Sequence, residues 1–170
     1  MNRIFISVLG IVVFLIGCGS AVDSGVGSEG SVIFLVRHAE KVDESDDSPL
    51  TEQGQLRAEK LADLLRDSGV QTIYSSDFVR TRLTAAPLAH QLGLEVEIYD
   101  HRNLDAFSRQ LMSSPGRYLV VGHSNTTPQL VGLLGGEPGL DIQSLEYDRL
   151  YMLAHRPGDD VATVVLRFNP

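Results

Sequence analysis

The most constraining feature of this chain is the segment Ser31 to Lys41 (Ser-Val-Ile-Phe-Leu-Val-Arg-His-Ala-Glu-Lys). Its apolar run ends abruptly in an arginine and a histidine. The run predicts a buried strand, which would deliver its last residues to the carboxyl edge of an α/β sheet, where ligand sites collect. Arg37 offers a planar, permanently charged fork for phosphate oxygens, and a neutral His38 is a nucleophile that needs neither a thiolate nor a metal. The pattern therefore indicates phosphate chemistry.

The size and charge of the chain exclude several other classes of protein. Its 170 residues are enough for one domain with a real core. The formal charge of −8 is opposite to what a nucleic-acid binder needs, and no cluster of lysine and arginine offsets it locally. Neither a Walker-type loop nor a Gly-x-Gly-x-x-Gly fingerprint is present, so we expect no nucleotide and no other cofactor.

The N-terminal residues resemble an export signal. Arg3 precedes an apolar stretch, Ile4 to Ile16, that is too short to span a hydrocarbon core of about 30 Å as a helix. A shortened membrane anchor is the alternative. The tetrapeptide Leu15-Ile16-Gly17-Cys18 is similar to a bacterial lipobox, which implies cleavage before Cys18 and attachment of lipid to its sulfur. Cys18 is the only cysteine and cannot form an internal disulfide.

These features predict three parts. Residues 1–17 would be a lipoprotein signal peptide, and residues 18–30, rich in glycine and serine, a lipid-anchored flexible tether. Residues 31–170 would be the folded domain. The protein would then be exported to a bacterial cell envelope and held on a membrane, on its periplasmic or outer face, through Cys18.

From Ser31 onward, strand-like and helix-like segments alternate, which is typical of an α/β layered domain. The first helix is expected to begin at Thr51 as its N-cap and to end before Gly69, with Leu56, Leu61, Leu64 and Leu65 on its apolar face. The next helix contains Pro87, which should kink or split it. The remaining expected elements are strands at 71–74, 95–99, 117–121, 145–154 and 161–168, and helices at 78–92, near 104–112 and from 123 to about 134.

Four blocks of sequence resemble the histidine phosphatase superfamily, whose fold is the phosphoglycerate-mutase-like one. They are Leu35-Val36-Arg37-His38-Ala39-Glu40, Leu50-Thr51-x-x-Gly54, Ser75-Ser76-Asp77-Phe78-x-Arg80-Thr81-x-x-Thr84-Ala85, and Val120-Val121-Gly122-His123-Ser124-Asn125. The blocks follow the family order, and the resemblance covers Val32 to Phe168. Phe78 and Leu83 stand where the family commonly has leucine and glutamine, which changes packing more than charge.

The resemblance implies a single three-layer α/β/α domain with a mostly parallel central sheet. It also implies a mechanism in which His38 attacks phosphorus in line and becomes phosphohistidine. Arg37, Arg80 and His123 would hold the phosphoryl oxygens, and water would then hydrolyse the intermediate. Ser124 and Asn125, which follow His123 in the same block, are expected to bind substrate. Two fixed arginines roughly neutralise a phosphomonoester, so no metal is expected.

The general acid is less well defined by the sequence. Asp100 is the first choice because it directly follows the strand expected at 95–99, while Asp105 and Glu40 remain alternatives. Asp105 would begin the next helix, where it could simply favour the helix dipole. The acidic loop Asp43-Glu44-x-Asp46-Asp47 lacks the spacing of a calcium loop and is interpreted as a solvated turn.

One further arginine and three further histidines are not expected to take part in catalysis. Arg82 is expected at the neighbouring surface or at the rim of the site. His90, His101 and His155 belong to no motif and are expected to be exposed.

The function expected from the sequence is hydrolysis of a small phosphomonoester. Two alternatives remain open: a phosphoglycerate-type mutase, and a catalytically inactive phosphate-binding lipoprotein. A mutase must retain and return the phosphoryl group, and an inactive binder would leave His38 without a purpose.

Overall fold

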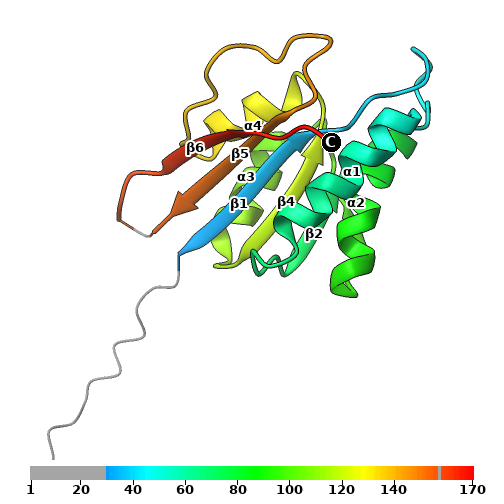
Figure 1. Cartoon of the computed structure of the whole chain (residues 1–170). Coiled ribbons are helices and arrows are strands. Elements are labelled where there is room, and N and C mark those ends of the chain that lie inside the picture. The colour runs from blue at the N-terminus through cyan, green and yellow to red at the C-terminus, as the bar shows by residue number, and fades with distance from the viewer. Residues whose placement is uncertain (1–29, 157) are drawn as a thin grey trace, which may run out of the picture.

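The computed structural model describes residues 30–156 and 158–170. The expected signal peptide, Cys18 and the tether up to residue 29 lie outside the described residues. The elements, shown in Figure 1, are β1 (Ser31–Arg37), α1 (Glu52–Leu65), β2 (Thr72–Ser75), α2 (Val79–Leu92), β3 (Val96–Ile98), α3 (Leu104–Ser113), β4 (Arg117–Gly122), α4 (Thr126–Leu133), β5 (Arg149–His155) and β6 (Ala162–Arg167).

The strands of the described residues form one six-stranded sheet in the order β3-β2-β4-β1-β5-β6. The four strands β3, β2, β4 and β1 are parallel, whereas β5 pairs antiparallel with β1 and with β6. Helices α1 and α2 pack on one face of this sheet, and α3 and α4 pack on the other (Figure 1). The predicted three-layer α/β/α fold with a mostly parallel sheet is confirmed.

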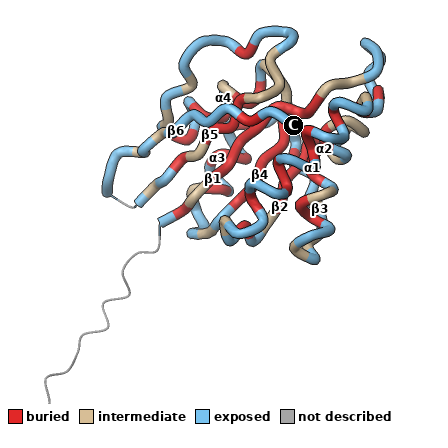
Figure 2. The backbone as a smooth tube through the Cα atoms, in the orientation of Figure 1, coloured by how far each residue is buried: buried red, intermediate tan, exposed pale blue. Residues whose placement is uncertain are grey.

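Strand β1 is apolar throughout because both of its faces are covered. Ile33 and Leu35 pack into the core beneath α3 and α4, and Phe34 and Val36 into the core beneath α1 and α2. Strands buried on both faces have continuous apolar sequences, since successive side chains point to opposite faces. Figure 2 shows the buried strands at the centre of the molecule and the exposed surfaces of the helices around them.

The apolar face predicted for α1 was wrong in part. Leu56 and Leu64 of α1 are exposed, and Ala58 and Ala62 join Leu61 and Leu65 on the buried face. This face has the i, i+3, i+4, i+7 spacing of an amphipathic helix, and that spacing, not the size of the leucine side chains, decides which residues are buried.

Pro87 does not split α2, which runs without interruption from Val79 to Leu92. Proline removes one helical hydrogen bond and crowds the preceding turn. Burial of Ala85, Leu88 and Ala89 against α1 and the sheet offsets this loss.

The strand expected from residue 145 begins only at Arg149. Residues 143–147 instead form part of the loop that precedes β5, and this loop contributes to the site described below. None of the helices in the described part of the chain is both long and apolar enough to cross a membrane.

Candidate active site

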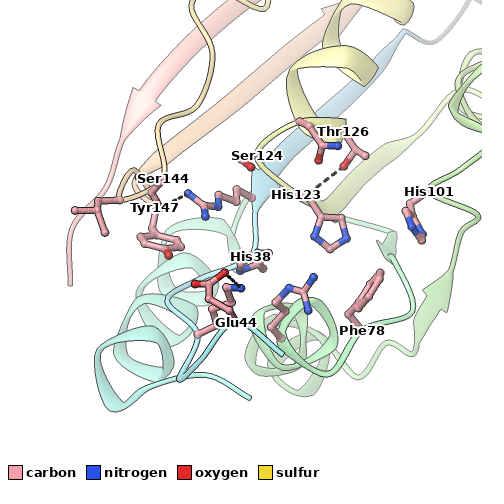
Figure 3. Close-up of a pocket in the computed structure, with 14 residues that line it drawn as sticks. His38, Glu44, Phe78, His101, His123, Ser124, Thr126, Ser144 and Tyr147 are labelled. Carbon is pink, nitrogen blue, oxygen red and sulfur yellow. Dashed lines mark hydrogen bonds and ion pairs between the residues drawn. The ribbon is translucent and has the colours of Figure 1, made fainter. Parts of the chain in front are cut away.

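A cavity of about 640 Å³ opens at the carboxyl edge of the parallel strands. Parallel strands bring the segments that follow them to one edge of the sheet, so residues distant in sequence meet there. The residues that line the cavity are Arg37, His38, Lys41, Glu44, Phe78, Arg80, His101, His123, Ser124, Asn125, Thr126, Ser144, Leu145 and Tyr147. Figure 3 shows Tyr147 on one side of His38, and His123 with His101 on the other.

His38 is a buried imidazole with one nitrogen fixed. Its Nδ1 lies 2.7 Å from the carbonyl oxygen of Ala39, and since a carbonyl only accepts, Nδ1 carries the hydrogen. The other nitrogen, Nε2, then carries no hydrogen and has a free lone pair. Burial, together with the nearby charges of Arg37, Arg80 and Lys41, lowers the pKa of His38 to about 4 despite the hydrogen bond to Ala39. The ring is therefore neutral near pH 7 and has the protonation state of a nucleophile.

The backbone that follows His38 is held in place by residues of the third sequence block. The amide of Ala39 donates to Oγ1 of Thr84 at 3.0 Å, and the Thr84 hydroxyl donates to the carbonyl oxygen of Arg80 at 2.8 Å. Thr84 thus connects the helix that carries Arg80 to the peptide that orients His38.

The start of α1 packs against the same stretch of chain. The amide of Thr51 donates to the carbonyl oxygen of Glu40 at 2.9 Å, and Oγ1 of Thr51 caps the helix by accepting from the amide of Gly54. A Cβ at Gly54 would lie 2.3 Å from the Glu40 carbonyl oxygen. Glycine is required because the helix and the loop after His38 approach each other this closely.

His123 is brought beside His38 by the pairing of β4 with β1. The amide of His38 donates to the carbonyl oxygen of Gly122 at 2.9 Å. A Cβ at Gly122 would lie 2.9 Å from the Tyr99 hydroxyl, so a larger residue would displace the start of the His123 loop. The His123 ring lies with its centroid 5.5 Å from that of His38 and presents an edge to it.

The second histidine is also neutral in this structure. Its Nε2 lies 2.9 Å from the hydroxyl of Ser76, and its backbone amide donates to Oγ1 of Thr126. Burial and the neighbouring charges of His38 and Arg80 lower the pKa of His123 to about 3. The cavity therefore holds two neutral imidazoles at neutral pH.

Arg37 and Arg80 have the same arrangement of donors. Nη1 of Arg37 donates to the carbonyl oxygens of residues 143, 144 and 146 at 2.9–3.0 Å, and Nη1 of Arg80 donates to the carbonyl oxygen of Asp46. The Nε atoms of both arginines are buried and have no hydrogen-bond partner. Within the described residues, they are the buried side-chain nitrogen or oxygen atoms of which this is true. A buried donor left unpaired costs about 1–3 kcal/mol. Independently of these Nε atoms, two arginine side chains that line one cavity offer charged donors to an oxyanion ligand.

Each arginine is also held by an aromatic ring. The Arg37 guanidinium carbon lies 4.1 Å from the centre of the Tyr147 ring, and that of Arg80 lies 4.4 Å from the centre of the Phe78 ring. Burial lowers the pKa of both guanidinium groups, but the ordinary pKa of arginine is so high that both stay charged near pH 7. Two guanidinium groups held by aromatic rings therefore line the same cavity as the two neutral histidines.

Arg82 lies outside the cavity that Arg80 lines, which agrees with its expected position at the surface or rim. It forms an ion pair with Asp77 near the surface and does not line the cavity. Ser124 and Asn125 do line the cavity, beside His123. The structure therefore brings together six of the site residues named from the sequence: Arg37, His38, Arg80, His123, Ser124 and Asn125.

Asp100 is the site residue that the structure does not bring to the cavity. It is exposed, its carboxylate accepts from the amide of Arg102 at 3.0 Å, and it lines neighbouring hollows of the surface. The two alternatives also lie elsewhere. Glu40 forms a bidentate ion pair with Arg57, and Asp105 lies in the first turn of α3. Within the described residues, Glu44 is the carboxylate that lines the cavity.

Several residues that line the site were not expected from the sequence, among them His101, Glu44 and Tyr147. His101 was expected to be exposed, but it is half-buried and lines the cavity, with its ring centroid 5.7 Å from that of His123. Glu44 was assigned to a solvated turn, and Tyr147 was placed inside a strand. No motif marked these residues, and a signal for Tyr147 would have required knowing that its loop folds back over Arg37.

The donors present are suited to an anion and not to a cation. Within residues 30–156 and 158–170, no group of three or more His, Cys, Asp and Glu side chains is placed to hold a metal ion. The arrangement can bind a tetrahedral oxyanion between the arginines and present a neutral imidazole nitrogen to it.

Comparison with known proteins agrees with this geometry. Residues 33–104 match the model of the histidine phosphatase superfamily (branch 1). A probable phosphoglycerate mutase of Escherichia coli is 36% identical over 77 residues. That match covers 41% of this chain and 35% of the relative, so the chain matches about a third of the relative's length.

Two solved structures have the same fold. The protein histidine phosphatase SixA, solved with tungstate, aligns with a TM-score of 0.63 at 19% identity, over 80% of this chain and 96% of the other. A phosphoglycerate mutase of Bacillus anthracis aligns with a TM-score of 0.63 at 15% identity, over 85% and 94%. The part of the chain that matches the histidine phosphatase superfamily, residues 33–104, holds the Arg37-His38 pair and Arg80.

Proposed function

We propose that this protein is a phosphomonoester hydrolase that acts through a phosphohistidine on His38. The observation that carries the proposal is the hydrogen bond from Nδ1 of His38 to the carbonyl oxygen of Ala39. Because Nδ1 carries the hydrogen, Nε2 has a free lone pair and can act as the nucleophile. His38 lines a cavity that the side chains of Arg37 and Arg80 also line. A nucleophile and preorganised oxyanion donors in one cavity are what phosphoryl transfer requires.

In the first step, Nε2 of His38 attacks phosphorus, a nitrogen–phosphorus bond forms, and the bond to the leaving oxygen breaks. The hydrogen bond from Nδ1 to Ala39 stabilises the charge that develops on the ring. The leaving alkoxide takes up one proton. In the second step, a water molecule attacks phosphorus, the nitrogen–phosphorus bond breaks, and inorganic phosphate and neutral His38 are restored.

Glu44 is our candidate for the proton donor to the leaving group. It lines the cavity, whereas Asp100, the choice from sequence, does not. Its carboxylate pairs with Lys41 at 2.8 Å, which keeps both side chains at the mouth of the cavity.

We also propose that the reaction needs no metal. A phosphomonoester carries about −1.5 to −2 charges near pH 7, and two guanidinium groups compensate for that charge. Activity should then survive EDTA. Complete inactivation by EDTA that Mg²⁺ or Zn²⁺ restores would reject this part of the proposal.

The substrate would be a small phosphorylated compound. A mutase is the second candidate, because the Escherichia coli relative is named a probable phosphoglycerate mutase. The two reactions differ in the fate of the phosphoryl group. A phosphatase releases labelled inorganic phosphate from a labelled phosphoglycerate, and a mutase returns the label to a second phosphoglycerate molecule. An inactive phosphate-binding protein would do neither.

The decisive experiment combines turnover with trapping of the intermediate. The purified protein should hydrolyse an aryl phosphate, and enzyme quenched in alkali should carry a phosphoryl group that survives base and is lost in acid. His38→Ala should remove both, while the exposed His90→Ala should change neither. An undiminished rate in the His38 variant would reject the mechanism.

A further inference from the structure

The ring of His123 is connected to a short chain of buried hydroxyl groups. Its Nε2 lies 2.9 Å from Oγ of Ser76, and Oγ of Ser76 lies 3.2 Å from Oγ1 of Thr81. The Thr81 hydroxyl in turn lies 2.7 Å from the carbonyl oxygen of Ser76 and 2.9 Å from that of Phe78. Ser76 and Thr81 are both completely buried, so water cannot take the place of any partner.

The direction of this chain of hydrogen bonds is fixed at its end. Carbonyl oxygens only accept, so the single hydrogen of Thr81 is donated to the backbone. Thr81 must then accept from the Ser76 hydroxyl, which uses the one hydrogen of Ser76. For the contact between Ser76 and His123 to be a hydrogen bond as well, Nε2 of His123 must donate. All the contacts are satisfied together in this arrangement alone.

A neutral His123 that carries its hydrogen on Nε2 has a lone pair on Nδ1. This nitrogen makes no hydrogen bond to any residue of the described chain, and the ring lines the cavity (Figure 3). His38 has the opposite tautomer, with its hydrogen on Nδ1 and its lone pair on Nε2. Both histidines therefore present acceptors, and not donors, to the cavity.

The surroundings of His123 favour this state while the cavity holds no anion. The charged and titratable groups that face it are His38, His101, Arg37 and Arg80. Burial of the ring and the positive charge of Arg80 and Arg37 oppose protonation, and the pKa of His123 is lowered to about 3. A bound phosphoryl group would reverse the balance, because its oxygens need a donor and its negative charge stabilises an imidazolium.

We propose that Ser76 and Thr81 are positioning residues that fix His123 as the Nε2–H tautomer, so that His123 takes up a proton at Nδ1 when a phosphoryl group binds. The inference rests on the proposed function, since it assumes that the cavity binds a tetrahedral anion. The proton comes from solvent, or from the substrate when it binds as a monoanion. Nδ1–H of the resulting imidazolium then donates to a phosphoryl oxygen, while Nε2–H continues to donate to Ser76.

Proton uptake on anion binding is the direct test. Tungstate is a tetrahedral dianion near pH 7 and carries no proton of its own. Its binding to the full-length protein can be followed by calorimetry in buffers of different ionisation enthalpy. We expect uptake of about one proton per tungstate bound. His123→Asn should abolish the uptake, and His38→Asn should leave it in place. The reverse pattern would show that His38 is the group protonated and would overturn the inference.

The hydroxyl variants test the positioning role. In Thr81→Val, the Ser76 hydroxyl is free to turn and donate to Nε2, so His123 can bind the dianion as an Nδ1–H tautomer without a proton from solvent. Proton uptake should fall by at least about half. Thr81→Ser keeps the hydroxyl and should keep the uptake of the unmodified protein. Ser76→Ala should behave like Thr81→Val. Unchanged uptake in both Ser76→Ala and Thr81→Val would overturn the inference.

The tautomer itself can be measured without ligand or turnover. The ¹⁵N shifts of the two ring nitrogens of His123 should identify an Nε2–H tautomer, and those of His38 an Nδ1–H tautomer. A His123 that carries its hydrogen on Nδ1 in the unliganded protein would reject the inference. Failure of tungstate to bind a protein with the expected tautomers would instead reject the proposed phosphatase site.

Discussion

His38 and His123 lie side by side because Arg37 of β1 is in register with Gly122 of β4. His38 directly follows Arg37, and His123 directly follows Gly122. The two ring centroids are 5.5 Å apart, with an angle of 69° between the ring planes. The rings are held by opposite nitrogens, His38 through Nδ1 and His123 through Nε2. A backbone register thus determines the distance between the proposed nucleophile and the residue that would bind the phosphoryl group.

The depressed pKa values of these histidines predict a loss of stability in mild acid. Their pKa is about 4 for His38 and about 3 for His123 in the folded protein, against 6.5 for an ordinary histidine. As the pH falls below 6.5, the unfolded chain binds protons that the folded protein does not. Each histidine then lowers the free energy of unfolding by up to about 1.4 kcal/mol per pH unit, until its folded pKa is reached.

Urea unfolding at intervals between pH 7.5 and 4.5 would measure this effect. The double variant His38→Asn, His123→Asn should show a weaker dependence on pH than the unmodified protein. His90→Asn, at an exposed histidine, should leave the dependence unchanged. Equal slopes in the unmodified protein and the double variant would show that other groups cause the acid sensitivity.

Arg80→Lys is expected to be a severe substitution. Lysine keeps the charge but lacks the planar fork, and the Nε donor that Arg80 holds buried without a partner would be lost. By analogy with removal of one oxyanion donor, kcat/KM should fall by about 10² to 10³, equivalent to about 3–4 kcal/mol.

Arg82→Lys is the matched control for Arg80→Lys. Arg82 pairs with Asp77 outside the cavity, so its substitution should change kcat/KM by less than about fivefold. A larger loss in the Arg82 variant than in the Arg80 variant would contradict the assignment of the pocket arginine.

The role of Glu44 predicts a dependence on the leaving group. An alkoxide needs a proton as it departs, whereas a nitrophenolate does not. Glu44→Gln should therefore lower kcat for an alkyl phosphate by about 10² or more, and for p-nitrophenyl phosphate by less than about threefold. Asp100→Asn, at a carboxylate outside the cavity, should affect neither substrate. If Asp100→Asn showed the selective loss instead, the expectation from sequence would be restored.

The lipobox-like tetrapeptide predicts a membrane-bound protein. Cys18→Ser should release the protein from membranes or leave it as an unprocessed precursor, as judged by fractionation and by mass spectrometry of the N-terminus. A chain that begins at Gly19 should be soluble and fully active, because the Gly/Ser-rich segment carries no catalytic group. Membrane retention of correctly cleaved Cys18→Ser protein would argue against lipid attachment.

The sequence by itself determined the framework of the site. A run that is apolar on both faces, as in Ile33 to Val36, predicts a strand between two layers of helices. Parallel strands of that kind share a carboxyl edge, so the residues that directly follow them must be near one another. Arg37, His38 and His123 needed no further information. Arg80 was expected from the resemblance of its sequence block to that of the histidine phosphatase superfamily.

Only the tertiary structure decided which side chains complete the cavity. The 143–147 segment reaches it because Arg37, more than a hundred residues earlier, binds its carbonyl oxygens. Glu44 reaches it from a loop that is held to α2 by contacts of Asp46 and Asp47. Asp100, which directly follows the expected strand, turns away because its carboxylate binds a nearby amide.

The chain of hydroxyl groups behind His123 also became visible only in three dimensions. Ser76 and Thr81 belong to one sequence block, and His123 belongs to another that lies more than forty residues later. A local pattern predicts which residues leave a strand at the sheet edge, because backbone geometry repeats along a strand. It does not predict loop conformations, because those depend on single hydrogen bonds between residues far apart in the chain.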